Sequence, residues 1–174
     1  MEPTISRSID VPATPAAVWS WVTDLPRMGE LSPENVGGRW LDGTGPALGA
    51  RFRGRNRNGE LRWWTRVRVV AFEPDRRFAF DVRTPLGSRV SRWEYVLAPS
   101  ATGCLVTENW YRIGSWVVRK FMGPRVTGRA DRPGYNVRSI EHTLAALEAR
   151  AQRGAQARSS AARPSSMRSR GIEP

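Results

Sequence analysis

Residues 131–153, DRPGYNVRSIEHTLAALEARAQR, predict the one long helix of this chain. Apolar residues recur there at spacings of three and four, the pattern of an amphipathic helix. The stripe consists of Val137, Ile140, Leu144 and Leu147. Asp131 is a suitable N-cap, Pro133 lies in the first turn, and Gly154 is a suitable C-terminal cap. A helix with one apolar stripe needs an apolar surface to cover.

Most of the sequence before this helix alternates between apolar and polar residues, as half-buried strands do. The predicted strands are residues 5–11, 36–41, 50–57, 60–72, 78–82, 91–97 and 104–110. Two short helices separate the first two strands, the first capped by Thr14 and the second within residues 27–31. Turn signals such as Asn58-Gly59 join the later strands, which predicts an antiparallel meander. We therefore predict an α+β fold, a curved seven-stranded antiparallel sheet wrapped around the long C-terminal helix.

The chain has 174 residues, enough for one domain with a sizeable core. We assign residues 1–153 to this domain and expect residues 154–174, rich in Arg, Ser and Ala, to be a disordered tail. No apolar run approaches the ~20 residues that span a bilayer, and the N-terminus lacks a signal-peptide core. The expected location is the cytoplasm.

The net charge is +12, and Lys120 is the only lysine among 28 basic residues. This arginine excess reflects either a compositional bias or an anionic partner, such as nucleic acid, a membrane surface or an acidic ligand. The C-terminal end is notably basic, since only Glu173 opposes Arg150, Arg153, Arg158, Arg163, Arg168 and Arg170. Any contact with an anionic partner is therefore expected in the tail and is expected to be weak. Single Cys and His residues exclude an intramolecular disulfide and a Cys metal cluster, and neither metal nor cofactor is expected.

Strand alternation turns one set of aromatic side chains towards the long helix. The set consists of Trp40, Phe52, Trp63, Phe80, Trp93, Tyr95 and Trp110. Rings of this size are difficult to close-pack, so they are typical of either a cavity for an apolar ligand or an ordinary aromatic core. Asn136, at the edge of the helix stripe, is placed to direct its carboxamide into such a cavity.

Glu108 lies in the same alternation that buries Cys104, Val106 and Trp110, and is therefore predicted to point inward. A buried carboxylate needs a partner or a raised pKa. With Tyr95 it is a candidate pair for proton transfer in the enolisation or dehydration of a bound carbonyl compound. The alternative is a structural ion pair with an arginine at the mouth of the cavity.

Several stretches together resemble the START-like superfamily, the polyketide cyclase/dehydrase and lipid-transport group. They are IDVPATPAAVWSWVTDLPRMGE (9–30), GARFRGRNRNG (49–59), RFAFDV (77–82), WEYVLAP (93–99), GCLVTE (103–108) and YNVRSIEHTL (135–144). The resemblance covers residues 5–147 and implies a helix-grip fold with a deep cavity between sheet and helix. Members bind apolar molecules there, including lipids, sterols and aromatic polyketides, and share no universal catalytic motif.

These observations leave three functions open. The first is the binding of a small hydrophobic molecule in the cavity. The second is a polyketide aromatase/cyclase or dehydrase that uses Glu108 and Tyr95. The third is a regulatory or nucleic-acid-associated protein that uses the basic surface and tail. The sequence does not specify an oligomeric state.

Overall fold

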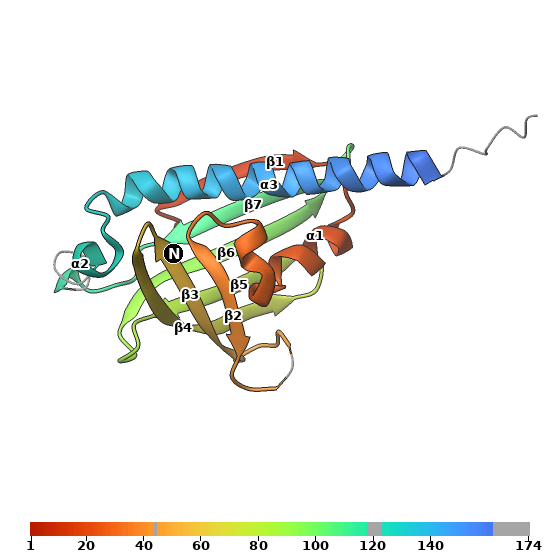
Figure 1. Ribbon diagram of the computed structural model, residues 1–174. Helices are drawn as coiled ribbons and strands as arrows, with labels where there is room; N and C mark the ends of the chain where they lie inside the picture. Colours follow the sequence, from red (N-terminus) through yellow and green to blue (C-terminus); the bar gives the residue numbers. More distant parts are fainter. Residues whose placement is uncertain (44, 118–122, 162–174) are drawn as a thin grey trace, which may run out of the picture.

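The computed structural model describes residues 1–43, 45–117 and 123–161 (Figure 1). In chain order the elements are β1 (Ile5–Val11), α1 (Pro15–Val22), η1 (Leu25–Glu30), β2 (Asn35–Trp40), β3 (Arg51–Asn58), β4 (Leu61–Glu73), β5 (Arg77–Arg83), β6 (Arg89–Pro99), β7 (Cys104–Tyr111), α2 (Gly123–Thr127) and α3 (Arg132–Ala161). The η1 element is a 3₁₀ helix. The predicted order of strand, two short helices, six strands and a long helix is confirmed, and a further short helix, α2, lies between β7 and α3.

The strands form a single seven-stranded sheet in the order β1-β7-β6-β5-β4-β3-β2, and all neighbours are antiparallel. Strands β2 to β7 follow one another as the predicted meander. Gly59 has a φ of 55°, which suits the tight turn between β3 and β4. Between β1 and β2, α1 and η1 carry the chain from one edge of the sheet to the other. As a result the first strand pairs with the last, with Ile5 opposite Trp110.

Helix α3 lies along β1 and β7 and covers the inner face of the sheet at that side (Figure 1). Its stripe is buried, with Ile140 and Leu147 fully inaccessible and Leu144 3% exposed. Each such burial contributes about 1.5–3 kcal/mol relative to an exposed side chain. The helix begins as predicted, because the carboxylate of Asp131 accepts a hydrogen bond from the Gly134 N–H at 2.9 Å. The predicted helix-grip arrangement is therefore present.

The shorter helices close other parts of the inner face. Thr14 caps α1, where its hydroxyl oxygen accepts the Ala17 N–H at 3.3 Å. Trp19 of α1 then packs against the rings of Phe72 and Phe78, with centroid distances of 5.1 and 6.0 Å. None of the helices in the described part of the chain is long and apolar enough to cross a membrane.

The predicted end of the long helix is wrong. Gly154 lies inside α3, which continues to Ala161, and its φ is not in the positive range that a C-terminal cap adopts. A glycine within a helix costs about 1 kcal/mol relative to alanine, and the Ala, Gln and Arg residues that follow favour the helix enough to offset it. Residues 154–161, assigned to a disordered tail, are thus helical, while residues 162–174 lie outside the described residues.

Candidate ligand-binding site

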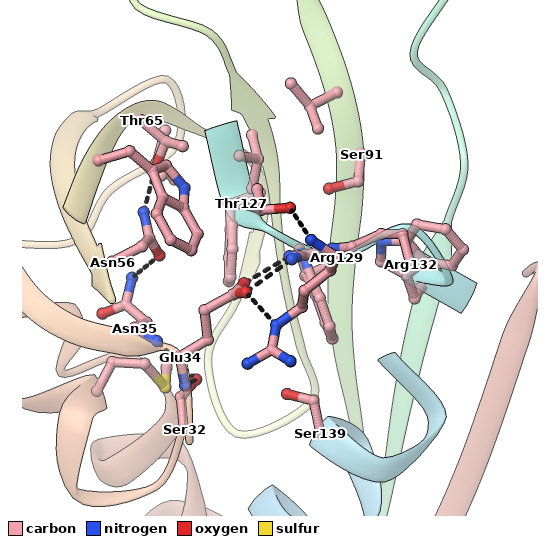
Figure 2. Close-up of a pocket in the computed structure, with 18 of the residues that line it drawn as sticks. Ser32, Glu34, Asn35, Asn56, Thr65, Ser91, Thr127, Arg129, Arg132 and Ser139 are labelled. Carbon is pink, nitrogen blue, oxygen red and sulfur yellow. Dashed lines mark hydrogen bonds and ion pairs between the residues drawn. The ribbon is translucent and has the colours of Figure 1, made fainter. Parts of the chain in front are cut away.

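A largely apolar cavity of about 400 Å³ lies between the inner face of the sheet and the helices. Its walls come from β3 to β7, from η1 and the segment after it, from α2, and from α3 (Figure 2). The volume falls within the range of about 300–1,000 Å³ that is typical of small-molecule sites. The aromatic rings come from inward-facing positions of the sheet, while polar groups come both from the sheet, as with Asn56 and Glu108, and from the helical side, as with Ser139.

Six of the seven aromatic residues predicted to face inward line this cavity. They are Phe52, Trp63, Phe80, Trp93, Tyr95 and Trp110. Trp40 does not line it. Its partner in the β2–β3 register is Phe52, which puts both rings on the same face of the sheet. The rings meet edge-on with centroids 5.4 Å apart, so Trp40 packs against Phe52 near the edge of the sheet.

Glu108 and Tyr95 are cross-strand neighbours on β7 and β6, and both line the cavity. The Tyr95 hydroxyl donates a hydrogen bond to Oε1 of Glu108 at 3.0 Å. Glu108 is 2% exposed, and its Oε2 has no hydrogen-bond partner among the described residues. Burial raises the pKa of Glu108 to about 8, although the hydrogen bond from Tyr95 lowers it. At neutral pH the side chain is therefore mainly a carboxylic acid.

The protonated state of Glu108 fits its surroundings. None of the ion pairs found among the described residues includes it, so the alternative of a structural pair with an arginine is not what the fold builds. Burial also raises the pKa of Tyr95 well above its usual value, which keeps the phenol as a donor. With Oε1 accepting from Tyr95, the proton of Glu108 on Oε2 is available to a molecule in the cavity.

Helix α3 contributes a polar row that faces the sheet. Ser139 and Thr143 line the cavity, and the Thr143 hydroxyl donates to the Ser139 carbonyl at 3.0 Å. Asn136 is one turn before Ser139 and is 1% exposed, but it is not part of the cavity lining. Neither its amide nitrogen nor its amide oxygen has a partner among the described residues. Its carboxamide is therefore buried with unused hydrogen-bonding capacity and, contrary to the prediction from the sequence, does not line the cavity.

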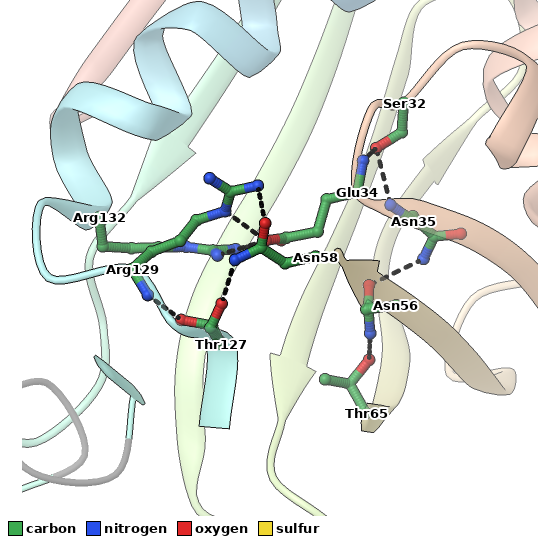
Figure 3. Close-up of polar contacts among 9 residues, drawn as sticks. All are labelled: Ser32, Glu34, Asn35, Asn56, Asn58, Thr65, Thr127, Arg129 and Arg132. Atoms are coloured by element: carbon green, nitrogen blue, oxygen red, sulfur yellow. Dashed lines mark hydrogen bonds and ion pairs between the residues drawn. The ribbon is translucent and has the colours of Figure 1, made fainter. Parts of the chain in front are cut away.

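An ion-pair cluster of Glu34, Arg129 and Arg132 crosses the cavity and was not anticipated from the sequence (Figure 3). Arg132 Nη1 and Nη2 donate to the two carboxylate oxygens of Glu34 at 2.7 and 2.5 Å. Arg129 Nε donates to Oε1 of the same carboxylate at 3.3 Å. The cluster links the segment before β2 to the start of α3.

Arg129 is held from other directions as well. Its Nη2 donates to Oδ1 of Asn58 at 2.9 Å, and its guanidinium lies 3.4 Å from the ring centroid of Tyr135. The side chains of Arg129 and Arg132 are 24% and 34% exposed, so they occupy the part of the lining that solvent reaches.

The only sequence signal for this cluster is a pair of arginines on either side of the helix N-cap. Glu34 is more than ninety residues away, and local patterns do not reveal such a contact.

The described residues contain no group of three or more His, Cys, Asp or Glu side chains that could hold a metal ion.

A second polar row continues from β2 into the sheet through Asn35, Asn56 and Thr65, with donor–acceptor distances of 3.5 and 3.4 Å. These contacts are long and therefore weak. Asn56 is buried and lines the cavity.

Comparison with known proteins agrees with this architecture. Residues 2–152 match the family model described as polyketide cyclase/dehydrase and lipid transport. A polyketide cyclase-like protein from Corynebacterium glutamicum, Cgl2372, is 30% identical over 83% of this chain and 88% of its own, with a TM-score of 0.58. No curated protein sequence matches the chain at a significant level.

Two further solved structures share the fold. Protein CV1439 from Chromobacterium violaceum is 16% identical, with a TM-score of 0.65 over 86% of this chain and 98% of its own. StfQ, a di-domain aromatase/cyclase of the steffimycin biosynthetic pathway, is 11% identical, with a TM-score of 0.67 over 87% of this chain and 51% of its own. The family match spans most of the sequence and agrees with the observed sheet and helix. The chain belongs to the polyketide cyclase/dehydrase and lipid-transport family.

Proposed function

We propose that the protein binds a small hydrophobic molecule, lipid-like or polyketide-like, in the cavity between the sheet and α3. The observation that carries this proposal is a cavity of about 400 Å³ that is lined by aromatic rings. Transfer of apolar surface from water into such a site is favourable by roughly 25 cal/mol per Å². Membership of a family that includes lipid-transport proteins supports the same function.

At the buried end of the cavity, Glu108 offers a hydrogen-bonding group that a ligand can satisfy. The proton on Oε2 of Glu108 has no partner within the described part of the chain, and an unmade hydrogen bond of this kind costs about 1–3 kcal/mol. A ligand that brings an ether, hydroxyl or carbonyl oxygen to Glu108 would remove that cost. We therefore expect ligands with one oxygen near Glu108 to bind more tightly than plain hydrocarbons of the same size.

Calorimetric titration with 1-dodecanol tests the proposal. Val82 on β5 lines the cavity, whereas Val96 on β6 does not. Val82→Trp would fill the space and is expected to abolish the binding heat, while Val96→Trp, a matched increase in size, should leave it unchanged. Both variants must show the circular dichroism of the unmodified protein. Equal binding by both variants would place the alcohol outside the cavity and refute the proposal.

A second candidate function is catalysis, and the Glu108–Tyr95 pair favours it. A carboxylic acid with a pKa of about 8 inside an apolar cavity can give a proton to a bound carbonyl or departing hydroxyl oxygen at neutral pH. This is the chemistry of a cyclase or dehydrase. If the protein is such an enzyme, Glu108→Gln should keep ligand affinity and abolish turnover of a polyketide substrate. If Glu108 only binds the ligand, no turnover will be found in either protein.

Within the described part of the chain, no specific contact favours a nucleic-acid function. The ring of Trp64 on β4, which lies among the arginines of the basic surface, has the guanidinium of Arg53 at 4.4 Å from its centroid. Arg66 lies near the same ring, at 6.0 Å. The ring of Trp64 thus already makes cation–π contacts with Arg53 and Arg66.

A further inference from the structure

We infer that the cavity selects an amphiphile with a carboxylate head group, and that Arg129 and Arg132 bind this carboxylate in the place occupied by Glu34. The inference rests on the proposed function, because it specifies the class of ligand for the same cavity. It depends on three features of the site: its charge, the geometry of the arginine pair, and the separation of the polar and apolar parts of the lining.

The first feature is an excess of positive charge in the lining. The ionisable acidic and basic side chains there are Arg112, Arg129, Arg132, Glu34 and Glu108. Glu108 is protonated at neutral pH, because burial raises its pKa. Three arginines therefore face one ionised carboxylate. In a partly desolvated site this imbalance favours the entry of an anion and opposes the entry of a cation.

The second feature is that the arginine pair already binds a carboxylate. Arg132 holds both oxygens of Glu34 in a bidentate arrangement, and Arg129 adds a third contact at 3.3 Å. The planar guanidinium fork matches a carboxylate in both spacing and direction, which a spherical ammonium group does not. Glu34 therefore shows the geometry that a ligand carboxylate would adopt.

Arg129 does not need Glu34 to stay in place. Asn58 accepts a hydrogen bond from its Nη2, and the ring of Tyr135 lies under its guanidinium. Glu34 by contrast lies on the short irregular segment between η1 and β2, across the cavity from the arginines. When a ligand carboxylate replaces it, the number of ion pairs is conserved and the Glu34 carboxylate becomes hydrated. Glu34 thus competes with the ligand from within the chain.

The third feature is the arrangement of the lining along the cavity. The arginine pair occupies the part that solvent reaches, whereas Phe52 and Tyr95 in the wall are 1% and 3% exposed. A molecule with its head group on Arg129 and Arg132 would extend its apolar part among buried rings. This is the orientation of a fatty-acid-like amphiphile.

The inference can be tested by titrating the protein with three probes that share one chain length: dodecanoate, 1-dodecanol and dodecylammonium. We expect dodecanoate to bind at least about tenfold more tightly than dodecanol at neutral pH, because hydrogen bonds between charged groups are stronger than those between neutral groups. Dodecylammonium should bind more weakly than dodecanol. Isothermal calorimetry below the aggregation concentration of each probe gives the three dissociation constants.

Three variants test whether the preference for dodecanoate over dodecanol depends on the ion-pair cluster of Glu34, Arg129 and Arg132. Arg132→Gln should remove most of the advantage of dodecanoate over dodecanol. Glu34→Gln should strengthen dodecanoate binding severalfold, because it removes the internal competitor. Arg55→Gln, at an exposed residue of β3 outside the cavity lining, removes the same charge and should change neither the dodecanoate nor the dodecanol dissociation constant by more than about twofold.

The outcomes separate this inference from the proposed function. If dodecanol binds as tightly as dodecanoate, the cavity binds apolar ligands but the head-group site does not exist. If Glu34→Gln weakens the binding of all three probes equally, the cluster only stabilises the contact between the start of β2 and the start of α3, and the inference is also wrong. If no probe binds, both the proposed function and this inference fail.

Discussion

Tyr95 and Glu108, opposite each other on β6 and β7, share a hydrogen bond of 3.0 Å in an environment closed to solvent. Strand alternation sends both side chains to the concave face, where α3 and the aromatic rings exclude water. The carboxyl group has no cationic partner there among the described residues, so it retains its proton at pH values at which an exposed glutamate is ionised.

The first prediction concerns the dependence of stability on pH. The pKa of Glu108 is raised to about 8 in the folded protein, whereas an unfolded glutamate titrates near 4.3. The folded state therefore binds more protons than the unfolded state between these values, and the contribution of Glu108 to stability is lost as pH rises. We expect that contribution to fall by about 1.4 kcal/mol per pH unit within this window.

Glu108→Gln isolates this effect, because glutamine is neutral at every pH and similar in shape. Urea denaturation of both proteins at several pH values between 5 and 8 gives the difference in their free energies of unfolding. The advantage of the unmodified protein over the variant should decrease steadily across the range. A difference that stays constant would show that Glu108 is ionised throughout.

The second prediction concerns Tyr95→Phe. This change removes the hydrogen bond that lowers the pKa of Glu108, so that pKa should rise further. The variant should also lose about 1 kcal/mol of stability, the usual net value of one hydrogen bond. Titration of the Glu108 side-chain carboxyl by carbon NMR gives its midpoint in both proteins. A midpoint that moves down would contradict the assigned direction of the Tyr95–Glu108 hydrogen bond.

The third prediction concerns Gly154→Ala in α3. The added methyl group would meet only the Arg158 side chain, 3.6 Å away, and the backbone at Gly154 is not in the positive-φ region. The substitution should therefore raise the free energy of unfolding by about 0.5–1 kcal/mol. Thermal denaturation followed by circular dichroism measures the change. If Gly154 instead formed a left-handed C-terminal cap, alanine would lower the stability.

The fourth prediction concerns Gly38→Ala in β2. A methyl group there would lie 2.0 Å from the Arg53 carbonyl oxygen and 2.7 Å from the Phe52 ring. One of these is rigid backbone, so the strand pairing must shift, and overpacking of this kind costs roughly 1–3 kcal/mol. Gly45→Ala, where no atom lies within 4 Å, is the matched control and should be close to neutral. Chemical denaturation of the two variants provides the comparison.

Most of the fold could be predicted from the sequence because its signals are local. Alternation places Phe80 and Trp93 on the inner face, and capping residues such as Thr14 and Asp131 mark where helices begin. Gly154 was misinterpreted because glycine is tolerated inside a helix when the residues after it are good helix formers. The inward direction of Glu108 followed from the same alternation, whereas its protonation depends on how completely the fold buries it.

The parts of the site that could not be predicted depend on contacts between distant segments. Glu34 meets Arg129 and Arg132 only because the meander brings the start of β2 opposite the start of α3. No spacing rule relates residues so far apart in the chain. Trp40 has the alternation of an inward residue, but its position at the end of a strand at the edge of the sheet puts it against Phe52 instead of the cavity.

The most direct test of ligand binding in the cavity is a measurement of intermolecular nuclear Overhauser effects in the complex with 1-dodecanol. The account predicts contacts from the methylene chain to the indole protons of Trp63 and Trp93, which line the cavity. Contacts only to Trp116, whose ring is on the surface and 58% exposed, would contradict it, as would the absence of any contact at saturating alcohol.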